Sequence, residues 1–121
     1  MFGYATTETE QLMPLSYELA RQLAVKHSEK RNDGSLEWAL PDAKTQVTVE
    51  YEVAAGLAKF LTPLRVECVL ISSQHKESAT NETIRADLKK LIEEVIPAKY
   101  LDYSDVSKIG RASKRQNTGL F

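Results

Sequence analysis

The sequence predicts an α+β domain, a two-layer sandwich in which two helices cover one face of a small, mostly antiparallel sheet. Three observations lead to this fold class. Leucine recurs at helical spacing early in the chain, two central segments alternate between apolar and polar residues, and a second helical pattern follows them. The expected order of elements is therefore helix, strand, strand, helix.

The first helix is expected over residues 12–30. Pro14 falls in its first turn, where the missing N–H is not needed, and Asn32-Asp33-Gly34 breaks the chain after it. A second helix is expected to begin at Thr80-Asn81 and to end at Pro97. The apolar face of the first helix consists of Leu12, Leu15, Leu19 and Leu23, and that of the second consists of Ile84, Leu88, Leu91, Ile92 and Val95.

Two strands are expected, over Thr45–Val53 and Leu64–Ser73. Residues 69–71 are apolar on both faces of the second strand, which predicts that both sides of the sheet are covered there. A further short strand is expected over Phe2–Thr6. One face of the first strand carries Val47, Val49, Tyr51 and Val53.

The composition fits one soluble globular domain: 121 residues, of which 42% are hydrophobic and 27% are charged. No apolar run approaches the about 18 residues that a membrane span needs, and the polar, acidic start is unlike a secretion signal. Cys68 is the only cysteine, which excludes an internal disulfide and favours a reducing compartment, here the cytoplasm.

Charge divides the chain into a domain over residues 1–105 and a basic tail over residues 106–121, which we expect to be disordered. The tail carries four bases and no acid; the rest carries 12 bases (16 minus 4) and 17 acids. The acidic body and the strand KTQVTVEY, which lacks the aromatic pattern of an RNA-binding sheet, argue against an RNA-binding domain. We expect no nucleic-acid partner and no membrane partner.

The segment Pro41-Asp42-Ala43-Lys44 is the most distinctive polar motif. Asp42 can accept hydrogen bonds from a ribose hydroxyl or an amine, and Lys44 can donate to a phosphate oxygen. Ordinary turn chemistry explains the same four residues more simply. Ser72-Ser73-Gln74-His75 places serine near histidine but supplies no orienting acid, and the two histidines and one cysteine lack the spacing of a zinc site.

Four segments carry a further signal. MFGYATTETEQLMPL is similar to the family segment MFGYAT-E-T---MPL, PDAKTQVTVEY to PD-K-QVT--Y, and PLRVECVLISSQH to PIRV---VIS-QH, and IPAKYLD closes the match. In this order, over about residues 1–102, they resemble the central domain of the S-adenosylmethionine synthetases, or methionine adenosyltransferases.

The resemblance implies an enzyme that joins ATP and methionine with the help of Mg²⁺ and K⁺. The methionine sulfur attacks C5′ of the ribose, and the departing tripolyphosphate is then hydrolysed to phosphate and diphosphate. The family's PD-K turn contributes to the ATP site and maps onto Asp42, Ala43 and Lys44, with Lys44 as the catalytic residue that stabilises phosphate charge. No metal ligand maps onto this chain. A homodimer, or pairing with a full-length synthetase, is also implied.

The resemblance further implies truncation at both ends. The family's amino-terminal domain with its HPDK segment, and the GDQG part of its GDQG-x-MFGYA loop, would precede residue 1. Its NP-GRFVIGGP region is replaced by DVSKIGRASKRQNTGLF. We therefore expect that the chain alone does not make S-adenosylmethionine. The alternative is a non-catalytic interaction or dimerisation module derived from that enzyme.

Overall fold

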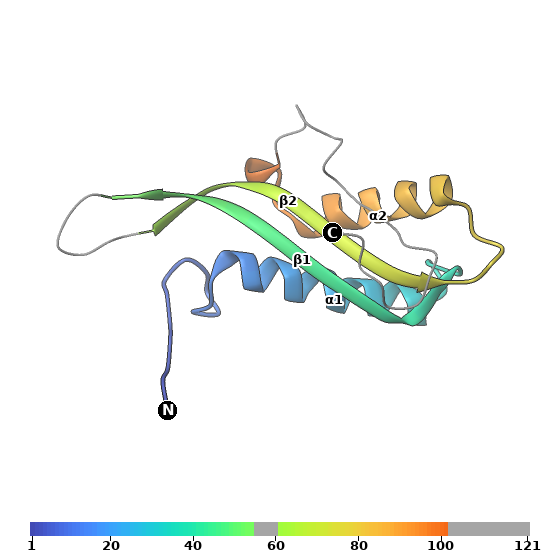
Figure 1. The fold of residues 1–121 in the computed structure, drawn as a ribbon, viewed down its shortest axis with the longest axis horizontal. Coiled ribbons are helices and arrows are strands. Elements are labelled where there is room, and N and C mark those ends of the chain that lie inside the picture. Colours follow the sequence, from blue (N-terminus) through green and yellow to red (C-terminus); the bar gives the residue numbers. More distant parts are fainter. Residues whose placement is uncertain (55–60, 102–121) are drawn as a thin grey trace.

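A computed structural model describes residues 1–54 and 61–101 (Figure 1). The two strands form one antiparallel hairpin, so the α+β class and the order of elements are confirmed. The predicted strand over Phe2–Thr6 is wrong: this segment is largely exposed and pairs with neither strand. The tail over residues 106–121 lies outside the described residues. The elements are α1 (Leu15–Asn32), β1 (Ala39–Val53), β2 (Leu61–His75), α2 (Asn81–Val95) and the short 3-10 helix η1 (Ala98–Tyr100).

Both helices pack on one face of the hairpin and form a single core with it. This core includes Leu19 and Leu23 of α1, Val47 of β1, and Ile84 and Ile92 of α2. The opposite face of β1 is exposed at Gln46, Thr48 and Glu50, as the alternation predicts. The buried apolar residues are Leu15, Leu19, Leu23, Leu36, Trp38, Ala39, Val47, Val66, Val69, Ile71, Ile84, Leu88, Leu91, Ile92 and Ile96.

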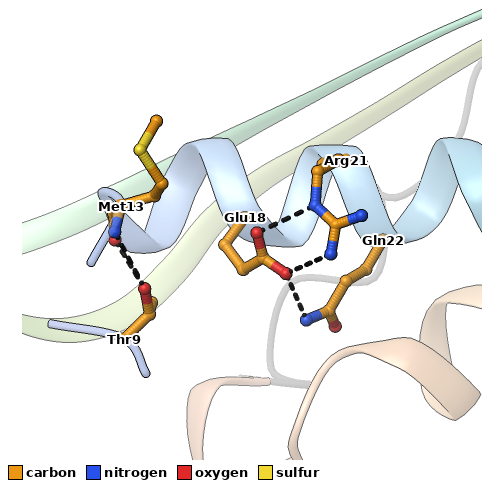
Figure 2. Close-up of polar contacts among 5 residues, drawn as sticks. All are labelled: Thr9, Met13, Glu18, Arg21 and Gln22. Atoms are coloured by element: carbon orange, nitrogen blue, oxygen red, sulfur yellow. Dashed lines mark hydrogen bonds and ion pairs between the residues drawn. The ribbon is translucent and has the colours of Figure 1, made fainter. Parts of the chain in front are cut away.

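The start of α1 is fixed by side chains that precede it. Pro14 has an extended ψ of 139°, so the helix begins at Leu15, and Leu12 lies outside it, half exposed, instead of on the buried face. The Thr9 hydroxyl accepts the Met13 N–H at 3.2 Å and donates to the Met13 carbonyl at 2.7 Å (Figure 2). The Glu8 carboxylate accepts the Leu15 N–H at 3.1 Å and thus caps the helix.

A buried carboxylate lies one turn further along α1. Glu18 is only 3% exposed, and it accepts hydrogen bonds from Arg21 Nε at 2.9 Å, Arg21 Nη2 at 2.6 Å and Gln22 Nε2 at 2.8 Å (Figure 2). The bonds from Arg21 and Gln22 lower the pKa of Glu18 below its usual value, although burial opposes them. The bidentate pair lets α1 keep a charge at a covered position.

The two strands are longer than the sequence predicts, and three irregularities interrupt their pairing. In β2, one extra residue lies between Pro63 and Arg65, which pair with the adjacent residues Tyr51 and Glu50. Another lies between Val66 and Cys68, which pair with the adjacent residues Val49 and Thr48. Such bulges shift which side chains face the core. Consequently Val66, Val69 and Ile71 all face the helices, whereas Leu70 lies half-buried on the opposite face. The remaining bulge lies in β1, between Ala39 and Ala43.

Candidate functional site

The bulge of β1 contains Asp42, and the other two predicted ATP-binding residues, Ala43 and Lys44, follow it directly as paired strand residues. Ala39 pairs with His75 and Ala43 pairs with Ser73, so β1 has three residues between these pairs and β2 has one. The segment is therefore not a turn ahead of the strand, as the sequence predicts, but part of the strand itself. Proline has no N–H to give to a sheet, which is why Pro41 is tolerated at a bulge.

The structure presents the two charged residues of this segment to solvent. Asp42 and Lys44 are exposed, and Ala43 between them is half-buried. Lys44 lies opposite Ser72 on the face of the sheet that the helices leave open. Within residues 1–54 and 61–101, no side-chain hydrogen bond or ion pair engages the Asp42 carboxylate or the Lys44 ammonium. Both groups are thus available to a ligand.

Further along the hairpin lies an ion-pair cluster, in which Arg65 contacts Glu50 on the neighbouring strand and Glu67 on its own strand. One guanidinium against two carboxylates leaves this cluster with a net negative charge, so it does not attract an anion. Among the described residues of this sheet face, Lys44 is accordingly the cation best placed to attract an anion.

The serine of the Ser72–His75 segment does pair with a histidine, but with one from another element. His27 Nε2 of α1 lies 3.0 Å from Ser73 Oγ, and both residues are 2% exposed. The Ser73 hydroxyl also donates to the Gln74 carbonyl at 3.1 Å, so its single proton is used there and His27 supplies the N–H. A pair buried in this way meets no substrate, and we assign it no nucleophilic role.

His27, Ser73, Trp38 and Asp87 form a connected set of contacts inside the fold, which we call the polar seam. The His27 ring meets Trp38 edge to face with a centroid distance of 6.3 Å, and Trp38 Nε1 donates to Asp87 of α2 at 3.0 Å. Burial lowers the pKa of His27 below its usual value, and the nearby positive charge of Arg31 adds to this. The seam therefore ties α1, the start of β1, β2 and α2 together beneath the bulge.

The sequence analysis missed this seam, although part of a signal exists. His27 follows Leu15, Leu19 and Leu23 at intervals of four, so it continues the apolar stripe of α1. Ser73 is in phase with Ile71 on β2. No pattern in the chain, however, relates positions that are 46 residues apart.

A second polar cluster, also missed, surrounds Glu8 at the opposite end of the hairpin. Besides capping Leu15, the Glu8 carboxylate accepts the Tyr51 hydroxyl at 2.7 Å and the Thr6 hydroxyl at 3.0 Å. Burial, and then the hydrogen bond to Glu8, raise the pKa of Tyr51 to about 12. A hollow of about 390 Å³ opens beside this cluster. Its lining is Tyr4, Thr6, Thr7, Glu8, Leu61, Thr62 and Pro63.

Metal-binding chemistry has little basis in these side chains. In the part of the chain that the structure describes, His, Cys, Asp and Glu nowhere gather in threes or more in a way that could hold a metal ion. These residues do not by themselves fit Mg²⁺, and no step through Mg²⁺ or K⁺ is assigned to them. Across the same residues, neither helix has both the length and the apolar character to cross a membrane.

Comparisons with known proteins identify the family. Residues 1–113 match the model of the S-adenosylmethionine synthetase central domain. An S-adenosylmethionine synthetase from Campylobacter jejuni, described as unusual, is similar in structure, with a TM-score of 0.73, 25% sequence identity and 93% of this chain covered. The chain spans 28% of the length of that protein. This chain therefore belongs to the S-adenosylmethionine synthetase family, in which it corresponds to the central domain.

Proposed function

We propose that this chain forms one wall of the ATP site of a methionine adenosyltransferase, which makes S-adenosylmethionine, phosphate and diphosphate from ATP, methionine and water. The observation that carries this proposal is the start of β1, which exposes Asp42 in the bulge and Lys44 just after it, both without described side-chain partners. A scaffold of this kind aims side chains at a ligand with little loss of conformational freedom. Membership of the family supports the same conclusion.

Each residue of the segment has its own part in the proposed site. Lys44 brings a compact positive charge with three N–H donors to the phosphates, and this charge stabilises the tripolyphosphate that leaves. Asp42 accepts hydrogen bonds from the nucleoside or from the substrate amine. Ala43 contributes backbone only, since its side chain is half-buried on the helix side.

These groups alone do not account for catalysis. One well-placed donor contributes about 3–4 kcal/mol to transition-state stabilisation, whereas enzymes lower barriers by about 8–23 kcal/mol. We therefore expect the isolated chain to bind phosphate without producing S-adenosylmethionine, and to need a second subunit or a full-length synthetase in the cytoplasm. Formation of S-adenosylmethionine by the purified chain with ATP, methionine, Mg²⁺ and K⁺ would contradict this expectation.

Calorimetric titration of ATP with Mg²⁺ into the chain tests the phosphate-binding role. Lys44→Ala is expected to weaken binding at least about tenfold, because a charge-assisted contact is lost. Lys89→Ala is the matched control, since Lys89 is equally a half-exposed lysine but lies on α2 and pairs only loosely with Glu93, at 3.9 Å. Equal loss in both variants, or unchanged binding in Lys44→Ala, would exclude a specific role for Lys44.

The second candidate function is an interaction module, and the end of the hairpin favours it. The hairpin extends beyond both helices (Figure 1), and Val53 and Leu61, which pair where β1 ends and β2 begins, are 57% and 46% exposed. Exposed apolar groups that lie together are typical of protein contacts. Size-exclusion chromatography with a full-length synthetase tests this: earlier elution that Leu61→Lys abolishes supports a contact, and unchanged elution of the mixture counts against one.

A further inference from the structure

The direction of the Lys44 side chain depends on the residues on either side of it. In a strand, successive side chains point to opposite faces, so an outward Lys44 requires inward neighbours. Ala43 and Thr45 are both half-buried on the helix side. Directly before them lies the bulge, where the pairing of β1 with β2 is interrupted. Residues 43–45 are thus the first regularly paired residues after the irregularity, and contacts that anchor them help to fix where the ladder begins.

Directly after Lys44, a side-chain hydrogen bond attaches β1 to α1. The Thr45 hydroxyl donates a hydrogen bond of 2.8 Å to the Ala20 carbonyl, in the middle of the helix. A backbone carbonyl has two lone pairs, so Ala20 can accept this bond as well as the helical one. The contact joins residues 25 apart and links the strand directly to the backbone of α1.

A second contact to the same helix lies before Lys44. Ala43 pairs with Ser73, and Ser73 is held by His27 at 3.0 Å. Ala20 and His27 are seven residues apart, two turns of one helix, so their contacts lie on the same side of α1. Lys44 is thereby flanked by two attachments to a single rigid element.

We propose that Thr45 is a positioning residue, which, with the His27–Ser73 pair, makes α1 hold the Lys44 side chain in its outward direction. The identity of the ligand that Lys44 binds rests on the proposed function, whereas the attachment of β1 to α1 does not. Thr45 touches no substrate in this proposal, and its effect reaches a ligand only through the backbone of residues 43–45.

Hydrogen exchange measured by NMR tests the proposal in the intact chain. In Thr45→Val, which keeps the shape of the side chain but removes the hydroxyl, the protected amides of residues 43–45 are expected to exchange about five- to tenfold faster. Amides of residues 49–51 are expected to change less than about twofold. Thr45→Ser keeps the donor and is expected to restore slow exchange, and Thr48→Val, on the open face of β1, serves as the control.

A failure of the positioning role and a failure of the proposed function give different results. Uniform loss of protection along β1, no loss at residues 43–45, or no rescue by Thr45→Ser would overturn the positioning role. If local loss and rescue occur, the positioning role stands, and titration of ATP with Mg²⁺ into the same variants then addresses the ligand. Weaker binding by Thr45→Val that Thr45→Ser restores supports both proposals, whereas an absence of binding by the wild-type chain removes the proposed function only.

Discussion

At the scale of residues, the three buried polar residues that the structure describes are paired, whereas the two charged residues of the proposed site are exposed and available. His27, Ser73 and Glu18 are almost completely buried, and each has a hydrogen-bond partner. Buried polar groups are costly unless they are paired, which explains this arrangement. Asp42 and Lys44 are exposed, which is what a ligand-binding role requires.

The buried histidine predicts an acid-sensitive fold. Because burial lowers the pKa of His27 in the folded state, the unfolded chain binds its proton more readily. The contribution of neutral His27 to the free energy of unfolding is complete above the pKa of the unfolded chain, about 6.5. As the pH falls below this pKa, the contribution is lost by at most about 1.4 kcal/mol per pH unit. Urea unfolding at several values between about pH 7.5 and 5.5 measures this slope.

The control for this prediction replaces both members of the buried pair. His27→Leu combined with Ser73→Val removes the titrating group and leaves no unpaired hydroxyl, so the slope is expected to flatten. Glu18 does not interfere, because its pKa is lowered and its carboxylate stays ionised over this range. A slope that persists in the double variant would mean that another group carries the pH dependence.

The sequence singles out Asp42 and Lys44 because both belong to one short motif, Pro41-Asp42-Ala43-Lys44, and their role in a site stays a prediction. The contacts of His27 with Ser73 and of Thr45 with Ala20 join distant parts of the chain, and only packing brings them together. Propensity and periodicity describe neighbours along the chain, so they do not reveal such pairs.

At the scale of elements, the helices were predictable and the strand pattern was not. Thr80 caps α2 by accepting the Thr83 N–H at 3.2 Å, and Asn32-Asp33-Gly34 ends α1 with Gly34 at φ +84°, both as expected. Caps and breakers are local signals. Bulges, in contrast, depend on the pairing of two strands, so the reversal of sides within β2 does not appear in its sequence alone.

The bulges of β2 predict which of two adjacent apolar residues contributes more to the free energy of unfolding. Ile71 is fully buried, so Ile71→Ala is expected to cost about 2–5 kcal/mol through the cavity it leaves. Leu70 lies on the open face and is only half-buried, so Leu70→Ala is expected to cost about 1 kcal/mol or less. Urea denaturation of both variants makes the comparison, and similar losses would contradict the assigned register.

At the scale of the whole molecule, one face of the sheet is covered by the helices and the other carries the proposed site. The helices supply the core and the attachments of β1, while the uncovered face presents Lys44. The chain spans 28% of the length of the similar synthetase, which leaves other segments of such a protein to complete a site. This agrees with the proposal that the chain forms one wall of a shared pocket.

The most direct test of the central claim is an NMR titration of the chain with tripolyphosphate. Phosphate binding by Lys44 and its neighbours predicts saturable shifts of the amides of residues 42–45 and of the Lys44 side chain, with the Lys89 side chain unaffected. The shifts are expected to disappear in Lys44→Ala. A folded chain whose resonances at residues 42–45 do not move, or in which the Lys89 side chain shifts as much as that of Lys44, would contradict the claim.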